Sequence, residues 1–322
     1  GRLDDFLVDP VDDTPRPGTI LRAICDRPVK GQGGMFVRLP GGSGFLRGAR
    51  GLKPGAALLV QVTGWAEEGK AVPVTDRVLF KSRYAIVTPG APGVNVSRRI
   101  RDEEARVRLK EIASSVIGAG GETGLILRSE AEAGTDEAIA GDIETLHDLA
   151  QAVLGDAEGR DPELLVDGPD AHELAWRDWP TPDLLADAPG SFADHGIDEM
   201  IADLRGPRVP LAGGAVAFVE PTRAMVAIDV NTGPDSSPAA GLKANIALAR
   251  DLPRQLRCRG LGGQIVVDFA PMPKKERRGL EQVLRAAFKA DPVETALAGW
   301  TPLGSYELQR KRERRPLGGG DR

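Results

Sequence analysis

Several kinds of residue are scarce in this 322-residue sequence, and each shortage excludes a class of protein. Aromatic residues make up 4%, and the two cysteines, Cys25 and Cys258, lie far apart without neighbours at metal-ligand spacing. This pattern disfavours a disulfide framework and a zinc finger. The sequence contains no apolar run of membrane-spanning length, and its beginning lacks the basic start and apolar stretch of a signal peptide. We therefore expect a cytoplasmic protein without a membrane segment.

Glycine and proline, by contrast, are abundant, with 40 and 25 residues. Their number predicts many turns between short elements rather than long helical bundles. Hydrophobic residues make up 41% and charged residues 28%, as in a globular protein that buries a core. The length predicts two or three domains.

The net charge of −5 conceals an uneven distribution along the chain. Between Glu130 and Asp203 there are 21 acidic and two basic residues, whereas Arg223 to Arg322 holds 18 basic and 11 acidic ones. A basic end beside an acidic middle suits phosphate binding, which depends on the local surface. Charge runs also solvate helices, so charge alone leaves both interpretations open.

The first part of the chain reads as short strands separated by glycine and proline. Residues 1–16 form an N-terminal segment whose apolar-polar alternation over 1–9 predicts an edge strand. Residues 17–82 predict a small Greek-key β-barrel, the OB-fold, because five strands follow one another closely. The predicted barrel strands are Thr19–Cys25, Gly34–Leu39, Gly44–Leu46, Ala57–Thr63 and Ala71–Leu79.

The middle of the chain mixes strands and helices. Within residues 83–160 we expect strands over Tyr84–Thr88 and Gly124–Ser129, a loop over Pro89–Asn95, a helix from Ser97 to Ile117, and a helix capped by Thr135 that reaches Leu154. Residues 161–210 are acidic and proline-rich with weak periodicity, and predict a connector without assigned elements.

Residues 211–322 predict an α/β domain with a central sheet, which makes the chain a mixed α/β protein. Its expected elements are a hairpin of 215–219 with 224–230, a helix over Ala239–Arg259 bent or interrupted at Pro253, a buried strand Gln264–Phe269 and an amphipathic helix Lys274–Ala290.

Two of these strands end in an aspartate. Asp229 ends one, and Asn231 lies two residues later on the same face, while Asp268 ends the buried strand. If the strands are neighbours, both carboxylates meet at one end of the sheet, where open α/β sheets bind ligands. Two such anions must share a proton or a cation, and oxygen-only ligands favour Mg²⁺, with Mn²⁺ as the alternative. The competing interpretation is that each aspartate caps the following turn.

Together these strings resemble the ribonuclease E/G family. The resemblance is carried by Ala227–Asn231, Arg254–Gly263 and Ile265–Phe269 in this order and spacing. Weaker likenesses extend through most of the chain: Met35–Val37 and Gly44–Leu46, Val96–Ile100, Gly124–Ser129, Glu307 and Arg310–Arg312.

The resemblance implies an endoribonuclease that hydrolyses single-stranded RNA and leaves a 5′-phosphate, with Asp229 and Asp268 holding Mg²⁺ and Asn231 supporting them. Arg128 is similar to the arginine that binds phosphate in this family. Ser129 stands where the family usually has a threonine, and it keeps the hydroxyl. An arginine fork suits a terminal monophosphate. The resemblance further implies RNA contacts at Arg98 and Arg99 in the 5′-sensing region, at Phe36 and Phe45 on the barrel, and at Lys70.

These RNA-binding assignments have alternatives. Arg128 could form an ordinary surface ion pair, Phe36 and Phe45 could belong to the barrel core, and Lys70 could lie in a solvated turn. The sequence also departs from the family pattern. It has no Cys-Pro-x-Cys zinc link, so a homo-oligomer would form without one. The segment before the catalytic region is shorter and more acidic, and Asn245 lacks the acidic residue that usually follows. We also expect the family's first strand, which would lie ahead of Gly1, to be missing.

Two other functions compete with the nuclease. One is a non-catalytic OB-fold RNA-binding or ribosome-assembly factor, against which the paired carboxylates argue. The other is a metal-dependent phosphohydrolase of small nucleotides, which the barrel and the basic C-terminal part disfavour.

Overall fold

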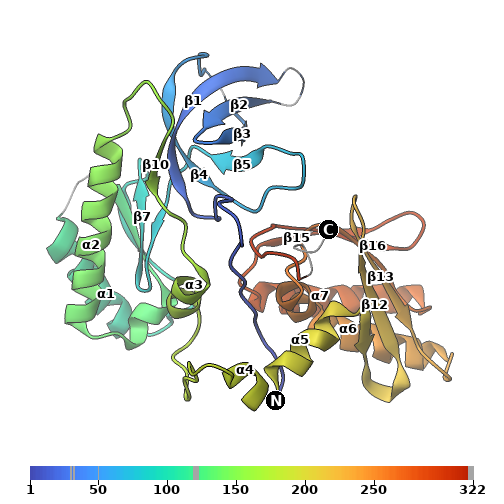
Figure 1. The fold of residues 1–322 in the computed structure, drawn as a ribbon. Coiled ribbons are helices and arrows are strands. Elements are labelled where there is room, and N and C mark those ends of the chain that lie inside the picture. The colour runs from blue at the N-terminus through green and yellow to red at the C-terminus, as the bar shows by residue number, and fades with distance from the viewer. Residues whose placement is uncertain (30, 32, 50, 119–122, 318–322) are drawn as a thin grey trace. The chain divides into compact units, whose positions relative to one another are not determined.

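The computed structural model describes residues 1–29, 31, 33–49, 51–118 and 123–317 (Figure 1). The chain forms two units, one of residues 13–183 and the other of residues 1–12 with 184–322. In the part of the chain described, no helix is long and apolar enough to cross a membrane.

The first unit begins with a closed five-stranded barrel, as the sequence predicts. Its strands are β1 (Ile20–Val29), β2 (Gly34–Leu39), β3 (Gly42–Arg47), β4 (Ala57–Val62) and β5 (Val72–Thr75). They pair in the order β1-β2-β3-β5-β4, and β4 returns to pair with β1. Alternate residues such as Val37, Leu46 and Val60 point inward and form the barrel core.

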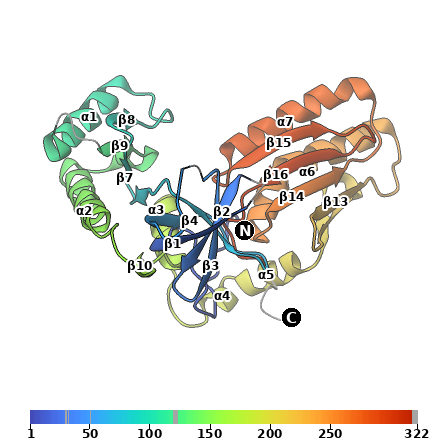
Figure 2. The same ribbon diagram turned by 90° about the horizontal axis from the view of Figure 1, so that it is seen from above.

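A four-stranded sheet with two helices completes this unit. Its strands are β6 (Phe80–Lys81), β7 (Ala85–Pro89), β8 (Gly93–Val96) and β9 (Thr123–Leu127), in the order β6-β7-β9-β8. The helices α1 (Glu103–Ile117) and α2 (Asp136–Gly155) pack beside them (Figure 2). Thr135 caps α2 as predicted, through a hydrogen bond from Ala138 N to its Oγ1.

Three predictions for this region were wrong. The predicted barrel strand Ala71–Leu79 is shorter, because Phe80 already pairs in the next sheet. The predicted loop before Ser97 contains the end strand β8, which pairs in parallel with β9. The helix begins at Glu103 rather than Ser97, because the carboxylate of Asp102 accepts the hydrogen bond from Glu104 N that caps it.

The acidic segment after α2 has regular structure that its weak periodicity did not predict. β10 (Glu163–Val166) adds to the barrel by pairing with β1, and α3 (Ala171–Asp178) follows. In the second unit the same acidic stretch continues as α4 (Ser191–Asp194), α5 (Ile197–Arg205) and β11 (Arg208–Pro210).

A six-stranded sheet forms the centre of the second unit. Its strands are β11, β12 (Val216–Pro221), β13 (Val226–Asn231), β14 (Gly263–Asp268), β16 (Tyr306–Arg310) and β15 (Thr295–Trp300), in that spatial order. β12 and β13 form the predicted hairpin, and β13 pairs with β14 in parallel. The parallel pair needs a crossover, which α6 (Pro238–Cys258) supplies.

The core of this unit lies between the sheet and two helices. Leu248 and Leu252 of α6 and Leu284 of α7 (Arg277–Ala290) are buried with Ile228 and Val267 of the sheet. Of the expected bend or interruption at Pro253, the interruption is not present, because α6 continues as one helix through this buried proline. The strands β15 and β16 were not predicted.

The N-terminal residues of this unit are not the edge strand that the sequence predicted. Residues 1–10 lie outside any helix or strand. The carbonyls of Leu3 and Asp4 accept hydrogen bonds from the guanidinium groups of Arg254 and Arg257 of α6. Side chains on a helix thus satisfy backbone groups that a neighbouring strand would otherwise satisfy.

Candidate functional site

Asp229 and Asp268 are adjacent on the sheet of the second unit. They are direct partners in the parallel register of β13 and β14, and both side chains are exposed. Neighbouring strands lie about 4.8 Å apart, and paired residues point to the same face of a sheet. The two carboxylates therefore project side by side from the end of the parallel pair.

The exposed position of both aspartates follows from the strand pattern. Ile228, Val230, Ile265 and Val267 point toward α6 and α7 and are buried. The residues between them point to the opposite face, so each strand presents a carboxylate there.

Asn231 is held against the first aspartate. Its Nδ2 donates a hydrogen bond of 2.7 Å to Oδ2 of Asp229. The bond uses one carboxylate oxygen and leaves Oδ1 available for another ligand. The three residues predicted to form the centre thus lie together, and two carboxylates with a supporting amide form an all-oxygen donor set.

This donor set fits Mg²⁺. The described residues contain no group of three or more His, Cys, Asp and Glu side chains arranged to hold a metal ion. Mg²⁺, however, is commonly bound by one or two carboxylates and keeps several waters, with substrate phosphate oxygens completing its shell. Asp229 and Asp268 would be the residues that hold it.

Asn245 of α6, to which the sequence assigned no role, locks the backbone just after Asp268. It is fully buried. Its Nδ2 donates to the carbonyl of Ala270 at 2.9 Å, and its Oδ1 accepts from Ala270 N at 3.0 Å. These two hydrogen bonds connect the backbone that follows β14 to α6. The sequence signal was an amide at a position of the helix that is flanked by the buried Ala244, Leu248 and Ala249.

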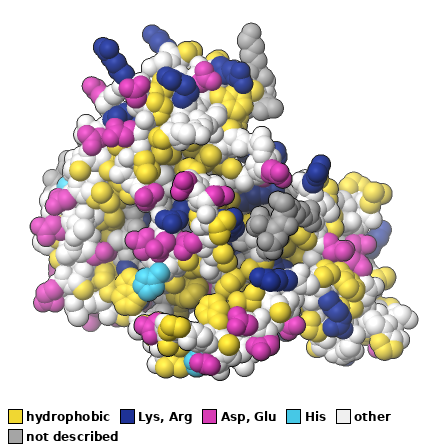
Figure 3. All heavy atoms as spheres, in the orientation of Figure 1, with side chains coloured by type: hydrophobic (Ala, Val, Ile, Leu, Met, Phe, Trp, Pro, Cys, Tyr) yellow, Lys and Arg dark blue, Asp and Glu magenta, His cyan; other side chains and the backbone are white. Residues whose placement is uncertain are grey.

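On the barrel of the first unit, Phe36 and Phe45 form a pair. They are register partners on β2 and β3, with ring centroids 5.5 Å apart. Both are half-buried and neither belongs to the barrel core, so the core alternative does not describe them. The guanidinium of Arg27 lies 5.2 Å from the Phe36 ring. In Figure 3, Lys and Arg side chains stand out around the barrel at the top of the view.

The other predicted RNA-binding residues of this unit lie in different settings. Arg98 and Arg99 are exposed in the turn between β8 and α1. Lys70 is in an exposed turn and forms an ion pair of 2.8 Å with Glu67.

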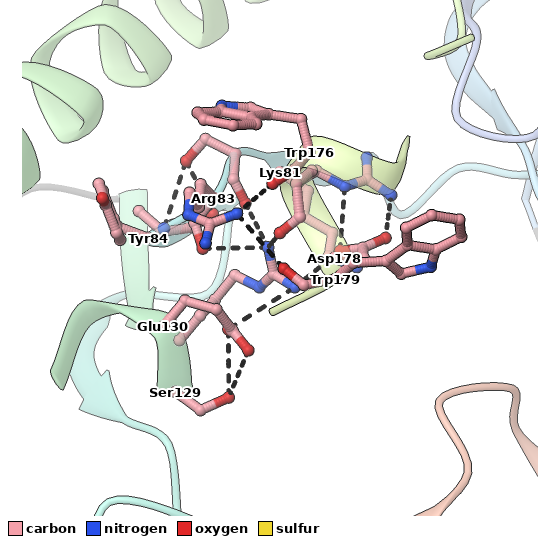
Figure 4. Close-up of polar contacts among 12 residues, drawn as sticks. Lys81, Arg83, Tyr84, Ser129, Glu130, Trp176, Asp178 and Trp179 are labelled. Carbon is pink, nitrogen blue, oxygen red and sulfur yellow. Dashed lines mark hydrogen bonds and ion pairs between the residues drawn. The ribbon is translucent and has the colours of Figure 1, made fainter. Parts of the chain in front are cut away.

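Arg128 and Ser129 contact carboxylates of the same unit (Figure 4). Arg128 Nη2 lies 2.7 Å from Oδ1 of Asp178, and Ser129 Oγ donates to Glu130 at 3.1 Å. Arg128 is therefore ion-paired, as the alternative interpretation predicted, but its side chain is only 12% exposed. The ion pair is a largely buried structural contact in which an anion already lies against the arginine.

Comparison with known proteins gives the same family relationship that the sequence motifs indicate. Residues 80–186 and 183–313 match the model of the Ribonuclease E/G family. The chain belongs to this family. It is 33% identical to "Ribonuclease E" of Nostoc sp. over 304 residues, which cover 81% of this chain and 44% of that protein.

Other members of the ribonuclease E/G family are similarly distant. Identity is 30% to "Ribonuclease E" of Synechocystis sp., with 81% of this chain and 44% of that protein covered. It is 29% to "Ribonuclease G" of Escherichia coli, with 83% and 62% covered. The chain thus spans about half the length of these curated relatives. Within this family member, Cys25 and Cys258 are free and buried, so neither is placed to link subunits.

Proposed function

We propose that this chain is a Mg²⁺-dependent endoribonuclease that hydrolyses single-stranded RNA in RNA processing or decay. The pairing of Asp229 with Asp268 in the register of β13 and β14 carries the proposal. Family membership supports it, since the relatives that the chain matches are named ribonucleases E and G.

The residues of the sheet have distinct roles in the proposed reaction. Mg²⁺, when bound, activates water and neutralises charge that develops on the phosphodiester. Asp229 and Asp268 supply the oxygens that hold the ion at the sheet end. Asn231 fixes the rotamer of Asp229 through its 2.7 Å hydrogen bond. Water attacks phosphorus and the bond to the 3′ oxygen breaks, which leaves a 5′-phosphate and a 3′-hydroxyl.

RNA binding is assigned to the first unit. The half-buried rings of Phe36 and Phe45 offer surfaces on which bases stack, and Arg27 adds positive charge beside them. Lys70, Arg98 and Arg99 contact the backbone. Arg128 and Ser129 recognise the 5′-monophosphate of the substrate, because a guanidinium fork and a hydroxyl can both donate to phosphate oxygens.

The experiment is cleavage of a fluorescent single-stranded RNA of about ten nucleotides, with Mg²⁺ or with EDTA, and mapping of the product ends. Asp229→Asn should lower the rate at least about a hundredfold while RNA affinity stays near the parent value, because the change removes a metal ligand and no base contact. Glu220→Gln is the matched control, because Glu220 is an exposed carboxylate on the neighbouring strand β12. Glu220 pairs with Ala227, which lies two residues before Asp229.

The same assay distinguishes the competing functions. RNA binding without Mg²⁺-dependent cleavage by the parent protein would favour a non-catalytic RNA-binding factor. Faster hydrolysis of a mononucleotide ester than of the RNA would favour a small-nucleotide phosphohydrolase. Full cleavage by Asp229→Asn would show that the assigned centre is wrong.

A further inference from the structure

Three cationic side chains from separate elements of the first unit converge on the carboxylate of Asp178 (Figure 4). Lys81 Nζ lies 3.1 Å from Oδ1, and Arg128 Nη2 lies 2.7 Å from the same oxygen. Arg177 Nη2 lies 2.8 Å from Oδ2. Lys81 comes from β6 and Arg128 follows β9, so the fold brings these two cations to Asp178, whereas Arg177 is the neighbour of Asp178 on α3.

The guanidinium of Arg128 is held rigidly from behind. Its Nη1 donates to the carbonyls of Ser82 at 2.5 Å and Arg83 at 3.1 Å. These bonds fix the plane of the group, so Nη2 points at Asp178 without further ordering. A pre-oriented fork loses little entropy when it binds an anion.

The positive charge of this cluster exceeds the negative charge of the carboxylates beside it. Lys81, Arg128 and Arg177 carry three positive charges, against Asp178 and the carboxylate of Glu130, which lies 3.9 Å from Arg128. Burial raises the pKa of Asp178, but hydrogen bonds from Arg177 and the nearby positive charges outweigh it, and the pKa lies well below its usual range. Burial, followed by repulsion from Arg177, lowers the pKa of Lys81. These three cations therefore stabilise a negatively charged group at the position of the Asp178 carboxylate.

The helix that carries Asp178 is weakly attached. None of the eight residues of α3 is buried, and the helix begins with a capping box of Asp170 and Glu173. Its end is held mainly by polar contacts. Arg83 donates to the carbonyl of Trp176 and lies 5.4 Å from its ring, which is largely exposed. An element without buried apolar contacts opens at little cost in free energy.

We propose that Lys81 and Arg128 form a binding site for the terminal phosphomonoester of RNA, and that Asp178 occupies this site as an internal competitor until the phosphate displaces it together with the end of α3. The proposal rests on 5′-end recognition by Arg128 and adds Lys81 and Asp178 to it. A phosphomonoester carries about −1.5 to −2 charges and three acceptor oxygens, whereas Asp178 offers one charge and two oxygens. A 5′-hydroxyl cannot compete with the carboxylate.

The test measures binding in EDTA, so that it does not depend on cleavage. A 3′-labelled single-stranded RNA of about twelve nucleotides carries either a 5′-monophosphate or a 5′-hydroxyl, and the ratio of the two affinities is the readout. Asp178→Asn should raise the preference for the monophosphate about tenfold, because a charged hydrogen-bond competitor is removed. Asp178→Glu, which keeps the charge, and Asp183→Asn, which changes an exposed aspartate nearby, should retain the parent ratio.

A second readout reports the displacement itself. Binding of the 5′-phosphorylated RNA to the parent protein should change tryptophan fluorescence, because Trp176 and Trp179 lie at the end of α3 beside Asp178. The 5′-hydroxyl RNA, and inorganic phosphate at the same concentration, should cause a smaller change. Trp176→Phe should remove most of the signal.

The outcomes separate this proposal from the nuclease assignment. An Asp178→Asn variant that melts at a lower temperature but keeps the parent affinity ratio would show that Asp178 only anchors α3, and would overturn the proposal while leaving cleavage unaffected. A lower preference for the monophosphate in that variant would also overturn it. A raised preference supports the proposal even if the parent protein does not cleave RNA.

Discussion

Asp229 on β13 and Asp268 on β14 are the last pair in the parallel register that joins the two strands. Their separation in sequence contrasts with their adjacency at one end of the sheet.

If both hold one metal ion, they act as a unit. We expect Asp229→Asn, Asp268→Asn and the double variant to lose cleavage to a similar extent, because removing either ligand already disables the ion. Initial rates over a Mg²⁺ series test this, and losses that multiply in the double variant would contradict it.

Asn245 should act on cleavage through the backbone that follows Asp268. Asn245→Ala removes both hydrogen bonds to Ala270 and leaves buried backbone groups unpaired, which should cost about 2 kcal/mol of stability. We also expect a higher Mg²⁺ requirement for cleavage with unchanged RNA affinity. Asn245→Asp keeps the acceptor but loses the donor, so the loss of stability and the rise in Mg²⁺ requirement should occur in a different proportion. An unaltered Mg²⁺ requirement in folded protein would mean that Asn245 is only structural.

Phe36 and Phe45 should contribute to RNA affinity more than to stability. Replacing either by alanine should weaken binding of single-stranded RNA by about 1 to 3 kcal/mol, the range for loss of one base–aromatic stack. Their half-buried position outside the barrel core predicts a modest change in melting temperature. Phe192→Ala, at an exposed phenylalanine of α4, is the control. Equal affinities in all variants would remove the barrel from the RNA-binding surface.

Asp291 holds a buried ionic network in the second unit. It pairs with Arg257 and, at 2.7 Å, with Arg310, and the side chains of Asp291 and Arg310 are each 1% exposed. Asp291→Asn removes the carboxylate that pairs with the buried Arg310 and one of the carboxylates around Arg257, and should destabilise the protein by about 3 kcal/mol. Denaturant unfolding measures this. Glu294→Gln, at a largely exposed ion pair with Lys311, should change stability by less than about 1 kcal/mol.

Cys258 should be chemically inert in the folded protein. Burial raises the pKa of its thiol to about 11, although Arg254 and Arg257 act in the opposite direction. Since the folded pKa is raised, the stabilising contribution is complete below the unfolded pKa of about 8.5 and is lost as the pH rises toward 11. A thiol reagent at pH 8 should react with Cys258 only after unfolding, and rapid labelling of the native protein would contradict this.

Several elements could be predicted from the sequence because local pattern determines them. The strands β13 and β14 are short apolar runs that each end within one residue of the predicted position, with Asp229 two residues before the end of β13 and Asp268 at the end of β14. The barrel strands are short runs between glycine-rich turns. Thr135 precedes two acidic residues, a pattern that favours the start of a helix. In each case the signal lies within a few residues.

Other elements gave no such signal. β15 is half-buried and has a register shift between Leu297 and Gly299, and one of the three buried positions of β16 is the charged Arg310, so neither strand has a clear apolar pattern. The helix α3 has no buried face and therefore no period to detect. The N-terminal residues alternate like a strand, but Arg254 and Arg257 bind their carbonyls instead.

The sequence by itself determined which carboxylates end apolar strands, the family to which the chain belongs and the presence of a small barrel, because these depend on residue order and short-range periodicity. Only the tertiary structure decided that Asp229 and Asp268 share a row, that Asn245 reaches Ala270, and that Asp178 lies against Arg128. These pairs are brought together by strand register and helix packing, which are long-range interactions that no single segment encodes.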